Sequence, residues 1–245
     1  MEQKVLRAVM VCLLLMSMAI LGRETAAYVE TVNAVNALQG NNADTDGIPT
    51  VVIDAGHGGD DPGKIGINGV PEKDINLRIT EKLRQYLEAD GIRVVLTRET
   101  EDGLYDASAP NKKVQDMKRR IEKIEQTDPV LTVSIHQNSY SDPQVKGPQV
   151  FYYADSENGR NLALAIQEEL NRQLSVARPR EAKGNRTYYL LKRSPSVINI
   201  VECGFLTNPE EAQLLKKEEY QTKIAMSVAD GIDTYLASQE EHEKN

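Results

Sequence analysis

The sequence predicts an α/β domain built on a mixed sheet of about six strands, with helices on both faces. Short runs rich in β-branched residues, such as Val51–Ile53 and Val130–Ile135, are separated by longer stretches whose apolar residues recur at helical spacing. Strands that alternate with helices are typical of α/β domains. The chain has 245 residues, 40% of them hydrophobic, which is enough to bury the core of one such domain.

Six segments have the residue types of strands, because valine, isoleucine, threonine and the aromatic residues fit a half-buried pleated surface. We expect these segments to form one sheet. In chain order they are Val51–Ile53, Arg93–Thr97, Val130–Ile135, Gln149–Tyr153, Thr187–Leu191 and Val197–Val201.

Four helices are predicted between and after these strands. The first covers about Glu72–Ala89, because apolar residues recur every four positions and Gly91 can end it. The second covers about Asn161–Leu174. The third begins at Asn208 and Pro209, a capping residue followed by proline in the first turn. The last has an apolar stripe formed by Ile224, Val228, Ile232 and Leu236.

The charge balance limits the classes of partner. The formal net charge is −8 and the isoelectric point is near 5.1, which argues against a nucleic-acid-binding protein, since such a protein presents a basic surface. The densest basic stretch alternates with apolar residues at helical spacing, so we interpret it as the solvated face of a helix. It consists of Lys112, Lys113, Lys118, Arg119 and Arg120.

The N-terminus has the three parts of an export signal. Lys4 and Arg7 precede an apolar run, and small residues follow it up to Ala27. The run is shorter than the roughly 20 residues of a spanning helix, which favours a signal peptide, although an uncleaved anchor stays open. We therefore expect residues 1–27 to be a signal peptide or an N-terminal anchor, and the protein to be exported, either secreted or tethered to the membrane.

The remaining chain divides into three parts. Residues 28–48 are polar and predict a linker, residues 49–237 are expected to form the folded domain, and residues 238–245 are a charged tail. Removal of the signal would leave Cys203 as the only cysteine, so no intramolecular disulfide could form. Free cysteines are usually small buried hydrophobic residues, and we predict this for Cys203 rather than a nucleophilic role.

Four side chains with catalytic or metal-binding chemistry fall at corresponding places of this scaffold. His57 follows the first strand and Glu72 opens the first helix. His136 ends the third strand and Glu202 ends the last one. The carboxyl ends of parallel strands and the helix starts that follow them share one edge of a sheet, so all four can converge there. Two imidazoles and one carboxylate suit a zinc ion with a position left for water, and a second carboxylate could act as a base.

Each of these residues also has a structural interpretation. A single histidine at a strand end is more often structural than metal-binding, and a glutamate at a helix start usually interacts with the helix dipole. The combination is more specific: of the three histidines, His242 lies in the tail and the other two end strands with acids beside them. A phosphate cradle at Gly56–Gly59 is rejected, because the turn lacks a third fingerprint glycine and a Walker lysine, and Asp60 and Asp61 would repel phosphate.

The chain contains four ordered motifs at these places. They are Val51–Gly59 (VVIDAGHGG), Glu72–Leu77 (EKDINL), Ser134–Asn138 (SIHQN) and Glu202–Asn208 (ECGFLTN). Together they resemble the motifs of the zinc-dependent N-acetylmuramoyl-L-alanine amidases of the Amidase_3 family. The resemblance covers about residues 49–237, which is essentially the whole predicted domain.

This resemblance implies a zinc-exopeptidase-like fold, a zinc ion held by His57, Glu72 and His136, and Glu202 as the catalytic carboxylate. It implies hydrolysis of the amide bond between the lactyl group of muramic acid and L-alanine in peptidoglycan. Within the family the chain is most similar to the germination-specific amidases of spore-forming bacteria. That similarity implies action on the spore cortex, where removal of the peptide prepares muramic δ-lactam formation.

The implied mechanism follows from general zinc chemistry. Zinc lowers the pKa of its water towards about 7 and polarises the lactyl carbonyl, while Glu202 accepts a proton and delivers it to the alanine nitrogen. Asp54 or Asn138 could orient a ligating histidine.

The chain departs from the family pattern at Ala55, Gln137 and Ser139, none of which is an implied ligand. The segment from Glu99 to Asp128 fits the pattern poorly, and no role is assigned to it. Two other functional classes stay open: a zinc exopeptidase acting on free peptides, which would use the same ligands, and a catalytically inactive peptidoglycan-binding module. An activating protein partner is not identified by the sequence.

Overall fold

The computed structural model describes residues 48–243, and its strands form one six-stranded mixed sheet in the order β2-β1-β3-β6-β4-β5. The strands are β1 (Thr50–Ala55), β2 (Arg93–Leu96), β3 (Leu131–Asn138), β4 (Gln149–Tyr153), β5 (Lys183–Asn185) and β6 (Ile198–Phe205). All neighbouring strands are parallel except β4 and β6, which are antiparallel. The predicted α/β fold with a mixed sheet is confirmed, whereas residues 1–27 and nearly all of the linker lie outside the described residues.

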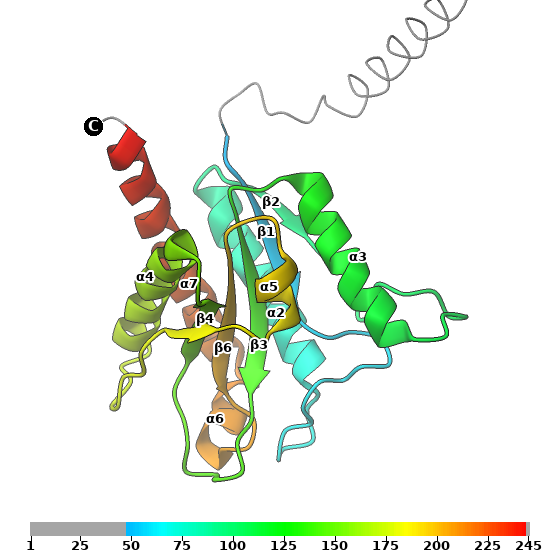
Figure 1. Ribbon diagram of the computed structural model, residues 1–245. Helices are drawn as coiled ribbons and strands as arrows, with labels where there is room; N and C mark the ends of the chain where they lie inside the picture. The colour runs from blue at the N-terminus through cyan, green and yellow to red at the C-terminus, as the bar shows by residue number, and fades with distance from the viewer. Residues whose placement is uncertain (1–47, 244–245) are drawn as a thin grey trace, which may run out of the picture. The chain divides into compact units, whose positions relative to one another are not determined.

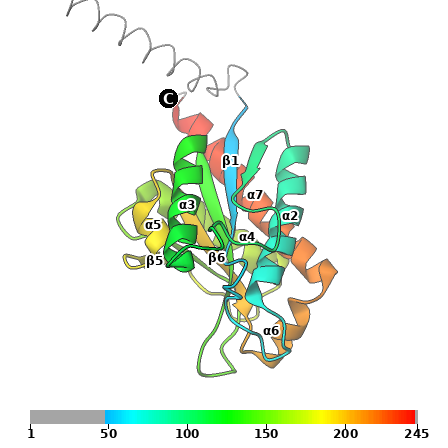
Figure 2. The same cartoon turned by 90° about the vertical axis from the view of Figure 1, so that its right-hand side faces the viewer.

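Helices cover both faces of the sheet, as predicted. They are α2 (Glu72–Ala89), α3 (Lys112–Thr127), α4 (Glu157–Gln173), α5 (Tyr189–Arg193), α6 (Pro209–Leu214) and α7 (Glu218–Glu243). Figures 1 and 2 show α3 and α5 on one side of the sheet and α2 and α7 on the other. The larger core lies under α2, α4 and α7, and a smaller core lies under α3 and α5.

Side-chain caps explain where three of the helices begin. The carboxamide of Asn111 accepts a hydrogen bond from Val114 N at 3.1 Å, before α3. The hydroxyl of Ser156 accepts from Gly159 N at 2.9 Å, before α4. Asn208 caps α6 by accepting from two backbone N–H groups, each at 3.0 Å. These bonds satisfy N–H groups that have no partner inside a helix, and they confirm the helix predicted at Asn208.

One predicted strand is wrong. Thr187–Leu191 runs into α5 and forms no strand. The sheet still has six strands, because β5 forms just before this segment. The cause is the side chain of Asn185, whose oxygen accepts from Thr187 N at 2.7 Å and from Tyr188 N at 2.8 Å. A short polar side chain that bonds nearby backbone in this way turns the chain and overrides the strand propensity of the residues that follow.

Other details add to the expectations from the sequence. Helix α7 continues to Glu243, into the segment predicted as a charged tail. The basic stretch does lie on a helix, but Arg120 is only 1% exposed and is not on its solvated face. Cys203 is fully buried, as predicted. Within residues 48–243, no helix combines the length and the apolar character that crossing a bilayer requires.

Candidate metal centre

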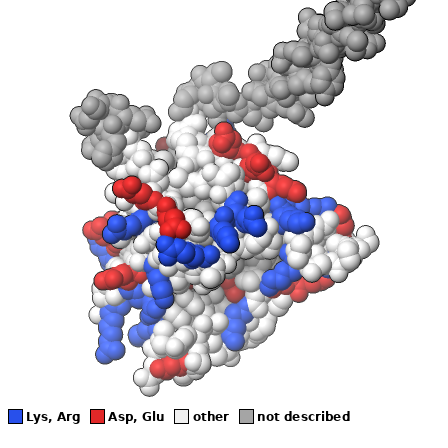
Figure 3. Space-filling model, viewed as in Figure 1, with Lys and Arg blue, Asp and Glu red and all other residues white. Residues whose placement is uncertain are grey.

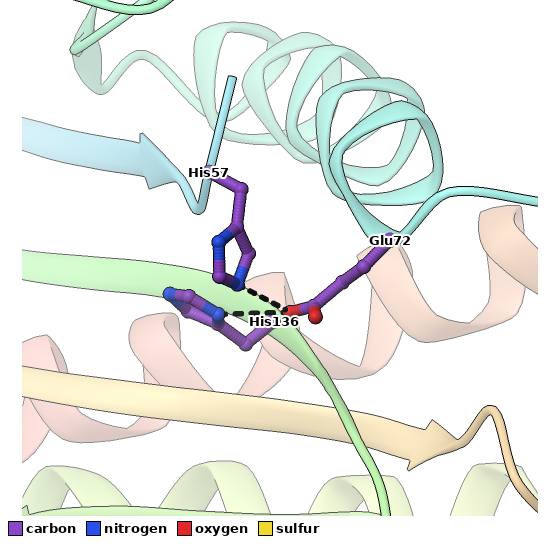
Figure 4. Close-up of side chains that lie close together, drawn as sticks. All are labelled: His57, Glu72 and His136. Carbon is purple, nitrogen blue, oxygen red and sulfur yellow. Dashed lines mark hydrogen bonds and ion pairs between the residues drawn. The ribbon is translucent and has the colours of Figure 1, made fainter. Parts of the chain in front are cut away.

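Three of the four predicted residues approach one another at one edge of the sheet (Figure 4). His57 follows β1, Glu72 is the first residue of α2, and His136 lies in β3. Glu72 Oε1 is 3.2 Å from His57 Nε2 and 3.0 Å from His136 Nδ1. One donor atom from each residue lies within 4.8 Å of the other two. Two nitrogens and one carboxylate oxygen at such spacing can hold one metal ion.

Glu202 reaches the same place through strand pairing. It pairs in register with His136 across the parallel strands β3 and β6. Paired residues of neighbouring strands point to the same face of a sheet, so both side chains face α3 and α5. Both strands also extend beyond these residues, to Asn138 and Phe205, whereas the sequence placed each residue at its strand's end.

The electrostatics differ between the two glutamates. Burial opposes ionisation of Glu72, but hydrogen bonds and charge from His136 and His57 hold its pKa well below the ordinary value. Burial raises the pKa of Glu202 to about 7, and the charge of Glu72 adds to this rise while His136 opposes it. The Oε2 atom of Glu202 is enclosed and has no hydrogen-bond partner among the described residues.

A buried pair of amides connects the surroundings of all three candidate ligands. Asn76 Nδ2 donates to Gly56 O at 3.0 Å and to Glu72 Oε1 at 3.4 Å. Asn76 Oδ1 accepts from Gln137 Nε2 at 3.1 Å, and Gln137 N donates to Glu72 Oε1 at 3.0 Å. Gly56 and Gln137 are the chain neighbours of the two histidines. Gln137, which the sequence identified only as a departure from the family pattern, therefore helps to fix the site.

Two glycines leave room for the candidate ligands. A Cβ at Gly56 would lie 2.3 Å from atoms of the His136 ring. Gly63 has a φ of 65°, and a Cβ there would lie 2.6 Å from both Glu72 Oε2 and His57 Cδ2. The backbone of Lys64 then donates to Glu72 Oε2 at 2.8 Å. Larger residues at either glycine would displace His136, Glu72 or His57.

The residue that orients His57 is Asp61, whose Oδ2 lies 3.1 Å from His57 Nδ1. The prediction that Asp54 or Asn138 orients a ligating histidine is not what the structure shows. The carboxylate of Asp54 bonds Arg120 at 2.6 Å, and the carboxamide of Asn138 accepts from the next backbone N–H. Asp61 lies only four positions after His57, in the loop that follows β1. This short separation was the signal in the sequence that could have predicted their contact.

Arg120 supports the site, a role that its sequence context did not predict. Its guanidinium bonds Asp54 Oδ1 and Asp116 Oδ2, both at 2.6 Å, and donates to His57 O at 2.6 Å. The available signal in the sequence was the four-residue spacing of Asp116, Arg120 and Ile124, which places them on one face of α3. All three are buried. The segment to which no role was assigned therefore supports the backbone of His57.

A cavity of about 480 Å³ opens beside Glu202 and the two histidines, between α3 and α5. Figure 3 shows acidic and basic side chains next to one another on this side of the molecule, without a continuous field of one sign. Other residues that line the cavity include Asp60, Tyr105, Lys112, Met117, Tyr188, Tyr189 and Leu190. The described residues thus combine a candidate metal centre with an enclosed carboxylate and an adjoining cavity.

Comparison with known proteins identifies the family. The Amidase_3 family of N-acetylmuramoyl-L-alanine amidases matches residues 51–234. The chain belongs to this family. The amidase is 35% identical to the germination-specific N-acetylmuramoyl-L-alanine amidase of Bacillus subtilis (strain 168), over 76% of this chain and 79% of that protein.

Solved structures agree with this assignment. The structure of the CwlD amidase from Clostridioides difficile in complex with the GerS lipoprotein has 40% identity and a TM-score of 0.75, and the match covers 78% of this chain and 99% of that one. The amidase AmiC2 of Nostoc punctiforme has 33% identity and a TM-score of 0.67, over 77% of this chain and 97% of that one. The predicted identity is confirmed: the amidase is a hydrolase whose family acts on peptidoglycan, outside the cytoplasm.

Proposed function

We propose that the amidase is a zinc enzyme, that His57, Glu72 and His136 hold the metal ion, and that Glu202 is the catalytic base. The observation that carries the proposal is the convergence of three donor atoms within 4.8 Å beside an unpaired, enclosed carboxylate oxygen. Two imidazoles and one carboxylate are a usual set for catalytic zinc. When bound, zinc would polarise the lactyl carbonyl and lower the pKa of a water molecule.

Glu202 has the properties that its role requires. Burial brings its pKa to about 7, so it can both take and release a proton near neutral pH. It accepts a proton from the attacking water while the oxygen of that water bonds the lactyl carbonyl carbon. It then gives this proton to the alanine nitrogen as the C–N bond breaks. The products are a lactyl carboxylate on muramic acid and a free amino terminus on L-alanine.

The narrower biological role is also a proposal. We infer that the substrate is the peptidoglycan of the spore cortex, and that the chain is exported through residues 1–27. The similarity to the germination-specific amidase of Bacillus subtilis supports the first part, and the charged and then apolar N-terminus supports the second.

Mass spectrometry of digested cortex peptidoglycan tests the bond and the substrate. We expect peptide-free muramic acid together with new L-alanine amino termini. New amino groups on diaminopimelate, with the muramoyl–alanine bond intact, would instead identify an endopeptidase.

Metal analysis tests the ligands. The purified enzyme should contain about one zinc ion per chain, and His57→Ala and His136→Ala should each lose it. Zinc retained at the wild-type level in both variants would reject this ligand set. Cell fractionation tests export: native protein found mainly in the cytosol, uncleaved and not bound to membrane, would contradict it.

A further inference from the structure

We propose that the cavity between α3 and α5 binds the glycan half of the substrate, with Tyr188 and Tyr189 as the surface on which a sugar ring packs. The inference rests on the proposed function, because it places the sugar beside the scissile bond. It specifies which half of the substrate lies in this cavity, which neither the sequence motifs nor the family match decides.

The position of the cavity is the first argument. Its wall includes His57, His136 and Glu202 together with Tyr188 and Tyr189. Its volume of about 480 Å³ lies within the range of roughly 300–1,000 Å³ that small-molecule sites occupy. A sugar held on the tyrosines would therefore lie in the same cavity as the candidate metal centre, within which its lactyl substituent has to reach the reacting atoms.

The two tyrosines form an exposed surface, and neighbouring residues hold Tyr188 in place. Tyr188 and Tyr189 remain 37% and 44% exposed, although both belong to a wall of the cavity. The ring of Tyr188 packs on Phe151, with 5.4 Å between centroids. The side chain of Asn185 fixes the backbone of Tyr188 through the 2.8 Å bond that begins α5. A pyranose ring has a face of C–H groups, which packs on a rigid aromatic ring at low entropic cost.

The charges of the cavity favour the glycan over the stem peptide. The stem peptide carries free carboxylates, which bind most strongly to cationic side chains. The two lysines of this wall each lie beside an acid, with Lys112 Nζ 2.6 Å from Asp60 Oδ2 and Lys113 Nζ 3.4 Å from Asp61 Oδ2, so a carboxylate of the ligand would also meet these acids. Arg120 is fully engaged by Asp54 and Asp116, so the cavity suits a neutral ligand.

The test varies the two halves of the substrate separately. Muramoyl peptides of fixed peptide length are compared with longer glycans carrying the same peptide, and a second series lengthens the peptide on one sugar. For the wild type, we expect kcat/KM to rise with glycan length. Tyr188→Ala and Tyr189→Ala should each lose that rise, with KM increased roughly tenfold and kcat little changed.

Two controls separate packing from a general loss of structure. Tyr188→Phe should behave as the wild type, because the ring rather than the hydroxyl makes the proposed contact. Tyr140→Ala should leave both series unchanged, because Tyr140 is 58% exposed and lies outside the cavity wall. Thermal unfolding of each variant establishes that it is folded.

A measurement on the unaltered protein completes the test. Peptide-free glycan strands should inhibit the wild type competitively, and the tyrosine-to-alanine variants should be inhibited less. Absence of inhibition, or a loss that follows peptide length instead of glycan length, would overturn the glycan assignment. Failure of the wild type to release L-alanine amino termini from any substrate would refute the proposed function itself, which is a different result.

Discussion

Asp54 and Glu202 are two enclosed carboxylates on either side of β3, and their environments have opposite effects. Asp54 pairs in register with Ser134, and Glu202 pairs with His136. Burial opposes ionisation of Asp54, but the charge of Arg120 and two hydroxyl hydrogen bonds lower its pKa to about 2. Burial raises the pKa of Glu202 to about 7.

Asp54 is fully buried and Glu202 is part-buried, but the main difference between the two carboxylates is their hydrogen-bond partners. Both Asp54 oxygens are bonded, to Thr97 and Arg120 on one side and to Ser134 on the other. Glu202 Oε2 has no partner among the described residues. A buried charge with a full set of partners stabilises the fold, whereas a carboxylate without them is available for proton transfer. The comparison can be tested from both sides.

The largest effect is expected at Glu202. Glu202→Gln preserves shape but cannot take a proton, so kcat should fall by about 10²–10⁴-fold with zinc content and thermal stability nearly unchanged. Glu211→Gln is the matched control, because Glu211 is a buried glutamate near the end of β6 that accepts hydrogen bonds from Phe205 N and Gly147 N. The control should lose stability and keep activity per folded molecule. Activity above about a tenth of wild type in Glu202→Gln would exclude the proposed base.

For Asp54, the carboxylate that is paired with Arg120, we expect a loss of stability rather than a specific loss of catalysis. Arg120→Met leaves the charge of Asp54 buried without its cation, and the free energy of unfolding should fall by about 3–5 kcal/mol in urea titrations. Arg119→Met, at the exposed neighbouring position bound to Asp106, should change it little. Equal effects of the two substitutions would show that burial of the Asp54 pair is unimportant.

Metal affinity should respond to the amide pair next to the ligands. Gln137→Met removes the donor that fixes Asn76, and the zinc dissociation constant, measured against a chelator, should rise about 10–100-fold. Gln167→Met is the control, because Gln167 is a buried amide that bonds Val150 N at 2.8 Å, away from the site. Both variants should lose stability, but only Gln137→Met should lose affinity. The same loss in both would reduce the amide pair to a general structural role.

The smallest effect concerns a single hydroxyl and depends on pH. Asp54 has a lowered pKa in the folded protein, so its stabilisation is present above the ordinary value of 3.8 and is lost as pH falls towards about 2. Ser134→Ala removes the 2.6 Å bond to Asp54 and should cost about 1.5 kcal/mol at pH 6. The difference from wild type should shrink near pH 2.

A matched serine gives the reference for that pH series. The hydroxyl of Ser227 is buried but bonds a backbone carbonyl of its own helix, not a charge. Ser227→Ala should therefore cost less, with no dependence on pH between 6 and 2. A pH-independent cost at Ser134 would show that its bond to Asp54 does not depend on the charge.

The sequence determined much of the fold and the place of the site. Helix α2 has the predicted bounds, because a four-residue apolar period is a local property that survives folding. His57, Glu72 and His136 meet as expected, since parallel strands bring their carboxyl ends to one edge. The family assignment is confirmed. The role of Glu202 stays a prediction, supported by its enclosure beside His136.

Only the tertiary structure decided which polar residues face inward and what they bond. Arg120 looked like one more solvated cation, yet Asp54, which makes its burial favourable, lies 66 positions away in sequence. Gln137 and Asn76 are 61 positions apart, and their pairing is invisible to any local pattern. Helical and strand periodicity reflects nearest neighbours along the chain, whereas the free energy of a buried polar group depends on partners that only folding brings into contact.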